Sequence, residues 1–162
     1  MNVLNKNKVY LFDTNVLIDL SVWLPVSLNK VFWEKLTEAL RDGVWILLDV
    51  VMNEIRGDND GLKDWCKNQE KSGFIKNIDD IHRERGIEIN STYKMIDETS
   101  FRSTVDTYLI AYAEANGLAI FSRESRRKKL DDLYKIPDVC KVLNIPTLRV
   151  PKVFFELIGY KN

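Results

Sequence analysis

The amino-acid sequence predicts an α/β fold, a Rossmann-like three-layer α/β/α sandwich with a central parallel sheet of four or five strands. Short apolar runs without polar alternation, typical of strands that are covered on both faces, occur at residues 9–12, 44–48 and 118–121. Segments with the apolar spacing of helices separate these runs. This alternation of strand and helix favours parallel strands joined by right-handed crossovers.

The elements can be assigned in chain order. The strand at residues 9–12 ends on Asp13, and apolar residues at helical spacing then predict a helix over residues 31–40. Residues 60–99 are more polar and predict several helical pieces that break near Gly86. Further helices are predicted at residues 50–55 and 105–116, after Pro137 and after Pro151, with one more strand at residues 148–150.

The composition is that of an ordinary folded protein. The 162 residues, 45% of them hydrophobic and 30% charged, suit one domain, which we expect to span residues 1–162. The 24 basic side chains balance the 24 acidic ones, so any nucleic acid must be bound by a local patch. Because the sequence has no long apolar run and no signal-like N-terminus, we expect a cytoplasmic protein without a membrane partner.

Four acidic residues lie at the ends of predicted elements. Asp13 directly follows the first strand, and Glu124 lies just beyond the strand at residues 118–121. Ligands of parallel sheets bind outside the carboxyl ends of the strands, which is where these two acids lie. Asp106 stands near the start of the helix that leads into that strand, and Glu54 lies on the short helix over residues 50–55. The four carboxylates can therefore converge.

Taken singly, each acid also has a structural explanation. Asp13 can be the N-cap of a helix, and the stretch Ser103-Thr-Val-Asp106 fits a capping box. Glu54 fits a solvated helix face, and Glu124 fits a surface ion pair with the arginines that follow it. Only the joint pattern distinguishes a site from caps and surface charges.

Three motifs together resemble the PIN-domain nucleases. They are "LFDTN", then "NEI" about forty residues later, then "DTYLIAYAEANGLAIFSRES". The resemblance covers most of the chain, and the stretch "KIPDVCKVLNIPTLRV" is similar to an uncharacterised bacterial PIN-like family close to the VapC-type toxin ribonucleases. It implies a single PIN-like domain.

The resemblance also implies roles for individual residues. Asp13, Glu54, Asp106 and Glu124 are then the catalytic acids that bind Mg²⁺ or Mn²⁺. Beside them, three residues take supporting roles: Thr14, Asn15, which braces the loop of the first acid, and Ser122, which stands where the family has threonine. The last acid is glutamate where many members have aspartate, a change that lengthens the side chain by about one bond.

The activity that the resemblance implies is metal-dependent endonucleolytic hydrolysis of RNA phosphodiester bonds, leaving a 5′ phosphate. It further implies a toxin of a type II toxin–antitoxin pair, with RNA as substrate, an antitoxin protein as partner and a homodimer. The alternative is a catalytically degenerate PIN-like module that binds RNA or protein without cleavage. A Mg²⁺ phosphohydrolase ranks third, because "DTN" lacks the second aspartate of a DxD pair.

A basic cluster follows the last acid. It comprises Arg123, Arg126, Arg127, Lys128 and Lys129. These cations can bind RNA phosphates beside the acidic pocket, or they can be the solvated face of a loop. The sequence leaves both interpretations open.

Overall fold

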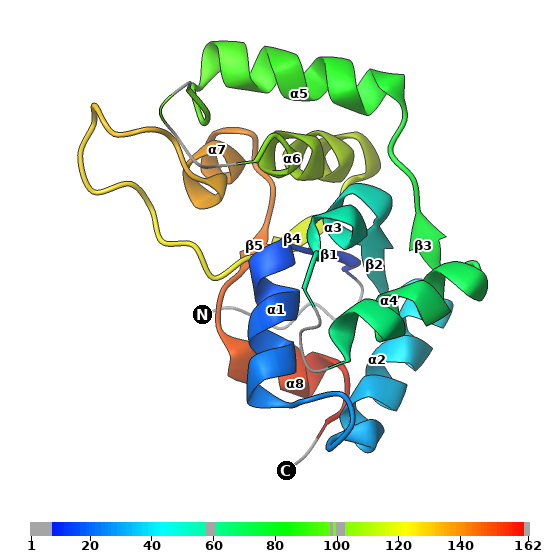
Figure 1. Ribbon diagram of the computed structural model, residues 1–162. Coiled ribbons are helices and arrows are strands. Elements are labelled where there is room, and N and C mark those ends of the chain that lie inside the picture. Colours follow the sequence, from blue (N-terminus) through cyan, green and yellow to red (C-terminus); the bar gives the residue numbers. More distant parts are fainter. Residues whose placement is uncertain (1–7, 58–60, 98, 100–102, 161–162) are drawn as a thin grey trace.

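Five parallel strands form the central layer of the protein, and helices cover both faces of the sheet (Figure 1). The computed structural model describes residues 8–57, 61–97, 99 and 103–160. The strands are β1 Tyr10–Phe12, β2 Trp45–Leu48, β3 Ile75–Lys76, β4 Ala119–Phe121 and β5 Thr147–Leu148. They pair in the order β3-β2-β1-β4-β5, and every pairing is parallel. The predicted α/β/α sandwich with a central parallel sheet of four or five strands is confirmed, and the sheet has five strands.

The helices form the two outer layers. They are α1 Thr14–Trp23, α2 Lys30–Arg41, α3 Asp49–Glu54, α4 Leu62–Lys71, α5 Asp80–Thr92, α6 Val105–Asn116, α7 Ile136–Val142 and α8 Pro151–Leu157. Helices α2 and α8 lie on one side of the sheet, and α5, α6 and α7 lie on the other (Figure 1). None of the helices in the described part of the chain combines the length and apolar composition that a membrane crossing requires.

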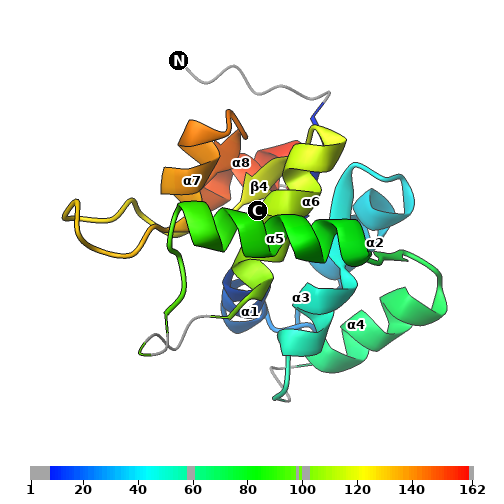
Figure 2. The same cartoon turned by 90° about the horizontal axis from the view of Figure 1, so that it is seen from above.

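The strand order reverses at β1: the strands that follow β1 in the chain are added first on one side of it and later on the other. From β1 the chain builds β2 and then β3 toward one edge, and it returns through α5 and α6 to place β4 on the other side of β1. Seen from above, α5 crosses over α6 (Figure 2). In open α/β sheets the crevice at such a switch point, outside the carboxyl ends of the strands, is where ligands bind.

An aromatic cluster fills one face of the sheet beneath this crevice. The fully buried ring of Phe154 on α8 lies 5.9 Å from Phe12, 4.8 Å from Trp45 and 5.0 Å from Phe121, measured between centroids. These three partners come from β1, β2 and β4. Leu11 of β1, which points to the opposite face by the alternation of the strand, is also fully buried. Burial on both faces explains why these strands read as continuous apolar runs.

The two edge strands differ from the prediction. β3 was not expected, because it has only the two residues Ile75–Lys76 and pairs with β2 alone. β5 is Thr147–Leu148 instead of residues 148–150. The chain leaves the sheet earlier because Val150 is already the N-cap of α8.

Helix α5 runs without a break through Gly86, so the predicted interruption there is wrong. The residue serves helix packing: a Cβ atom at this position would lie 2.7 Å from Cδ1 of Tyr108 and 3.0 Å from Oγ1 of Thr107, both on α6. The absence of a side chain therefore lets α5 approach α6 closely, at the cost of a weaker helix former in mid-helix.

We expect Gly86→Ala to destabilise the protein by about 1–3 kcal/mol, the usual cost of forcing extra atoms into a packed contact. The gain in helix propensity, about 1 kcal/mol, opposes this loss but does not relieve the clash. Urea unfolding measures the difference, with Glu84→Ala on the exposed face of α5 as the control. A Gly86→Ala variant as stable as the control would show that the two helices are not in tight contact.

Candidate functional site

Asp13 lies at the switch point of the sheet. It follows β1 directly, and its backbone N–H donates a hydrogen bond of 3.0 Å to the carbonyl oxygen of Phe121 at the end of β4. The residue is only 4% exposed, although it carries a carboxylate. It occupies the N-cap position of α1, but its side chain makes no capping hydrogen bond. The capping role that the sequence allowed therefore does not account for the carboxylate.

The hydroxyl of Ser122 holds the Asp13 side chain. Its Oγ donates to Oδ2 of Asp13 at 3.0 Å, and it accepts a bond of 3.2 Å from the backbone N–H of Glu124. Ser122 therefore orients the first acid, the role expected of the residue that replaces threonine. Asn15, expected to brace this loop, has an exposed side chain.

Burial raises the pKa of Asp13 to about 6. The hydrogen bond from Ser122 lowers the pKa, and the carboxylates of Glu124 and Glu54 raise it through charge repulsion. The backbone N–H of Asn15 also lowers it, although its geometry falls short of a capping hydrogen bond. Asp13 is thus a desolvated acid whose charge is repelled by two other carboxylates.

Glu54 is linked to the first acid's loop through Thr14. The hydroxyl of Thr14 donates to Oε1 of Glu54 at 2.6 Å and joins the start of α1 to the end of α3. Thr14 is buried and Glu54 is half-buried. A short hydrogen bond to a carboxylate is strong, so this bond restricts the half-buried side chain of Glu54 to one rotamer.

Glu124 is held by the first turn of α7. Its Oε2 accepts a hydrogen bond of 3.0 Å from the backbone N–H of Ile136. The charge of Glu124 still acts on Asp13. The structure thus brings three of the four predicted acids, Asp13, Glu54 and Glu124, to the carboxyl ends of the central strands.

The fourth acid, Asp106, is half-buried in the first turn of α6. The predicted capping box does not form, because Thr104 is the N-cap; the hydroxyl of Ser103 instead accepts a hydrogen bond from the backbone N–H of Val105 at 3.1 Å. The turn before Asp106 also borders a cavity of about 510 Å³, called here the Glu54 cavity. Its lining is Val50, Asn53, Glu54, Arg56, Arg83, Ser103, Thr104, Val105 and Tyr108. Glu54 and the start of α6 therefore face the same space.

The donor chemistry of these acids fits a hard divalent cation. Carboxylate oxygens are the ligands that Mg²⁺ and Mn²⁺ prefer, and Mg²⁺ commonly uses one or two carboxylates together with water and substrate phosphate. In the described ranges no group of three or more Asp, Glu, His or Cys side chains is arranged to hold a metal ion. Oxygens of Glu54 and Glu124 instead accept the bonds from Thr14 and Ile136.

Two residues of the predicted RNA-binding cluster make contacts that hold the loop after β4 in place. Arg123 pairs with Asp19 at 2.8 Å, and its guanidinium lies 4.6 Å from the ring of Trp23. Arg127 donates to the carbonyl oxygen of Leu130 at 2.7 Å. The other three residues of the cluster, Arg126, Lys128 and Lys129, are exposed. The interpretation as a loop face thus accounts for Arg123 and Arg127.

Two cations at the cavity beside Glu54 were not predicted from the sequence. Arg56 and Arg83 line the Glu54 cavity, and the guanidinium of Arg83 lies 5.4 Å from the centroid of the Tyr108 ring. Arg56 stands directly after the motif "NEI", which was a signal that could have been used. Arg83 reaches the cavity only through the packing of α5, which no local pattern encodes.

Comparison with protein families gives one match. The model of a family described as "Domain of unknown function (DUF4411)" matches residues 10–157, from β1 to the end of α8. No curated protein shows significant similarity to the chain.

Proposed function

Because the chain belongs to the DUF4411 family, whose description names no activity, we propose a function from its own site: a metal-dependent endoribonuclease that hydrolyses RNA phosphodiester bonds. The observation that carries the proposal is the position of Asp13. A carboxylate that is 4% exposed stands at the switch point of the sheet and interacts electrostatically with Glu54 and Glu124. A buried carboxylate with other carboxylates near it destabilises a fold when ionised, and titratable groups perturbed in this way cluster at functional sites.

In the proposed site, Asp13 and Glu54 hold Mg²⁺ or Mn²⁺, with Glu124 and Asp106 as further acids. When bound, such an ion holds the scissile phosphate and lowers the pKa of an attacking water. Ser122 and Thr14 keep the first two carboxylates in place through the hydrogen bonds that they donate. Groups that orient metal ligands in this way commonly contribute about 10–100-fold in metal affinity or activity.

RNA is favoured as the substrate by the cations at the Glu54 cavity and by the PIN-like motifs. Clustered carboxylates repel a phosphodiester, so a nuclease needs positive charge beside them. Arg56 and Arg83 provide it, since both line the Glu54 cavity together with the start of α6. The motifs at Asp13, Glu54 and Asp106 resemble those of PIN-domain nucleases, which supports the same activity.

We expect the purified protein to cleave single-stranded RNA in Mg²⁺ or Mn²⁺ and not in EDTA. Glu54→Gln keeps an acceptor for Thr14 but removes the charge, and it should lower the rate at least about 10-fold, the lower end of the cost of disturbing a metal site. Glu156→Gln, on α8 away from the crevice, is the matched control. Cleavage that persists in EDTA and in Glu54→Gln would contradict the proposal.

The toxin role that the resemblance implies has its own test in cells. Expression of the active protein should arrest bacterial growth and create new RNA 5′ phosphates, whereas Asp106→Asn should do neither. Equal behaviour of the two proteins would favour the alternative, a module that binds RNA or a protein partner without cleavage.

A further inference from the structure

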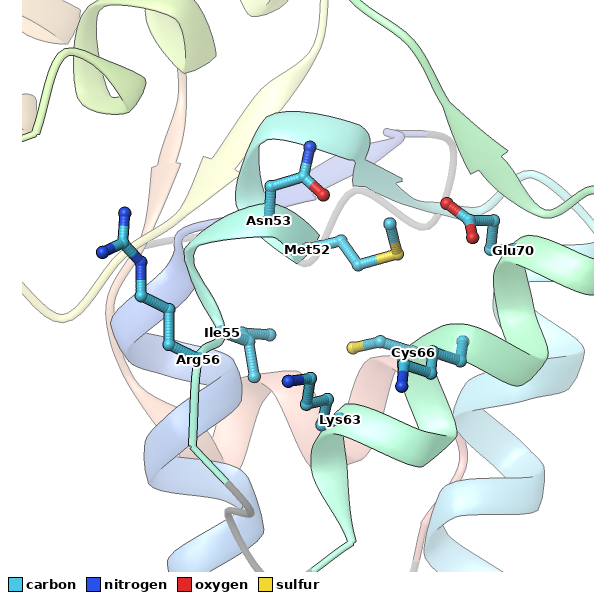
Figure 3. A pocket seen from close by; sticks show the side chains of 8 residues that line it. Met52, Asn53, Ile55, Arg56, Lys63, Cys66 and Glu70 are labelled. Carbon is cyan, nitrogen blue, oxygen red and sulfur yellow. The ribbon is translucent and has the colours of Figure 1, made fainter.

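A second pocket lies beside Glu54, between α3 and α4 (Figure 3). It has a volume of about 350 Å³ and is called here the α3–α4 pocket. Its lining is Met52, Asn53, Ile55, Arg56, Lys63, Cys66, Lys67 and Glu70. Figure 3 shows Met52 on α3 facing Cys66 on α4 across the opening, with Lys63 at one end and Glu70 at the other. The pocket thus combines an apolar interior with a charged border.

The interior is apolar because it is made from the core side of the two helices. Ile55 is 4% exposed and Cys66 is 1% exposed. Burial raises the pKa of the Cys66 thiol to about 12, so this side chain is neutral at physiological pH. Met52, which is only half-buried, offers the apolar surface against which a flat, weakly polar group such as a nucleobase can pack.

The border carries an excess of positive charge in a chain whose net charge is zero. Three cations, Arg56, Lys63 and Lys67, stand against the single carboxylate of Glu70. All three cations are exposed, and they make no ion pair with any residue within the described ranges. Lys63 and Lys67 lie one turn apart on the same face of α4. Unpaired cations at this spacing are suited to a phosphate group.

The α3–α4 pocket adjoins the proposed catalytic site. Asn53 and Arg56 line both this pocket and the Glu54 cavity, so the short helix α3 is the wall between them. Arg83 borders the Glu54 cavity and Lys67 borders the α3–α4 pocket, which places cations on both sides of Glu54. A polyanion that lies across the Glu54 cavity therefore meets further positive charge at the α3–α4 pocket.

We propose that the α3–α4 pocket binds the RNA strand next to the bond that is cleaved. Lys63 and Lys67 bind a backbone phosphate, and Met52 packs against the adjoining base. This inference rests on the proposed function, since it extends the substrate path of the same site. Single-stranded RNA is the occupant, because the face of a base can pack against Met52 only when that base is not stacked and paired in a duplex.

The test measures RNA binding separately from cleavage. The parent carries Glu54→Gln and binding is measured in EDTA, so that a fluorescent single-stranded RNA remains intact while its anisotropy is followed. Adding Lys63→Gln and Lys67→Gln should weaken binding at least about 10-fold at low salt and reduce the slope of log affinity against log salt by about 1.4, the value for two contacts with single strands. Lys141→Gln with Lys152→Gln, exposed lysines on α7 and α8, makes the same change in charge and should leave binding within about twofold.

Each outcome bears on the inference separately from the proposed function. Binding that is the same in the pocket variant and in the parent would overturn the inference, even if the unmodified chain cleaves RNA. The positive charge at the border of the pocket would then favour an acidic protein segment as the partner. Loss of binding together with an inactive unmodified chain would support the pocket and contradict the nuclease. If the parent binds no RNA, both fail. Arginine at both lysine positions should restore binding, which excludes misfolding as the cause.

Discussion

Replacement of Asp13 by asparagine is expected to stabilise the protein at pH 8 by up to about 3 kcal/mol while lowering RNA cleavage more than about 100-fold. The stabilisation follows from burial, which raises the pKa of this carboxyl from 3.8 to about 6. Ionising it in the folded protein therefore costs up to about 3 kcal/mol relative to the unfolded chain, because each pKa unit corresponds to about 1.4 kcal/mol. Asparagine is close in shape, accepts the hydrogen bond from Ser122 and carries no charge.

The sign of the pH dependence follows from the same shift. Between the two pKa values the folded protein binds more protons at Asp13 than the unfolded chain, so stability falls as the pH rises from about 3.8 through about 6. Above pH 6 the penalty is fully present, and below pH 3.8 it is absent. The variant and the natural chain should therefore differ most at pH 8 and converge near pH 4.

Urea unfolding in EDTA at pH 4 and pH 8 measures this difference, and RNA cleavage in Mg²⁺ measures the activity. Asp131→Asn, an exposed carboxylate in the loop before α7, is the matched control and should change neither quantity. An Asp13→Asn variant that is less stable than the natural chain at pH 8 would show that the carboxylate stabilises the fold. The acid would then be structural, and the proposed site would lose its main support.

Phe154→Ala is expected to destabilise the protein by about 3–5 kcal/mol, the range for removing a buried phenylalanine from a core. The ring is fully buried and lies within 6 Å of the rings of Phe12, Trp45 and Phe121. Its removal leaves a cavity under the three strands that carry the crevice. Since single domains have a total stability of about 5–15 kcal/mol, the loss is a large part of the whole.

Phe155→Ala is the matched control for this experiment, because the neighbouring ring on α8 is only half-buried. It should cost clearly less in urea unfolding. Equal losses for the two variants would contradict the central place of Phe154 in the core. Asp13 lies one residue beyond Phe12, so Phe154→Ala should also reduce RNA cleavage under conditions where the protein is still folded.

The elements that sequence predicts well here are those that are buried on both faces. Residues 9–12, 44–48 and 118–121 left continuous apolar runs because β1, β2 and β4 are packed between two helical layers. β3 left no such signal, since an edge strand of two residues with an exposed lysine needs no apolar run. Gly86 was misread because glycine breaks isolated helices, whereas here the packing of α5 on α6 overrides that propensity.

The residues of the candidate site also fall into those that the sequence reveals and those that only the fold brings together. Asp13 could be predicted because the end of a buried strand is visible in the sequence, and its position at the sheet's switch point agrees with that expectation. The bond from Thr14 to Glu54 joins residues 40 positions apart, which only the fold brings together. Arg83 and Lys63 could not be found, because exposed cations have no periodic signature that separates a binding surface from an ordinary solvated face. The nuclease activity and its metal stay predictions.

The hydrogen bond from the backbone of Ile136 to Glu124 closes the neck of the intervening segment. Two further hydrogen bonds anchor the segment inside this neck: the backbone N–H of Arg127 donates to Asp138 at 3.0 Å, and that of Tyr134 donates to the carbonyl oxygen of Lys94 at 3.1 Å. Residues 128–133 form the tip between these anchors. The tip of this segment can therefore gain, lose or exchange residues in evolution while the carboxylate at its base keeps its place. Among related chains, length differences in this stretch should be tolerated more easily than any change at the neck itself.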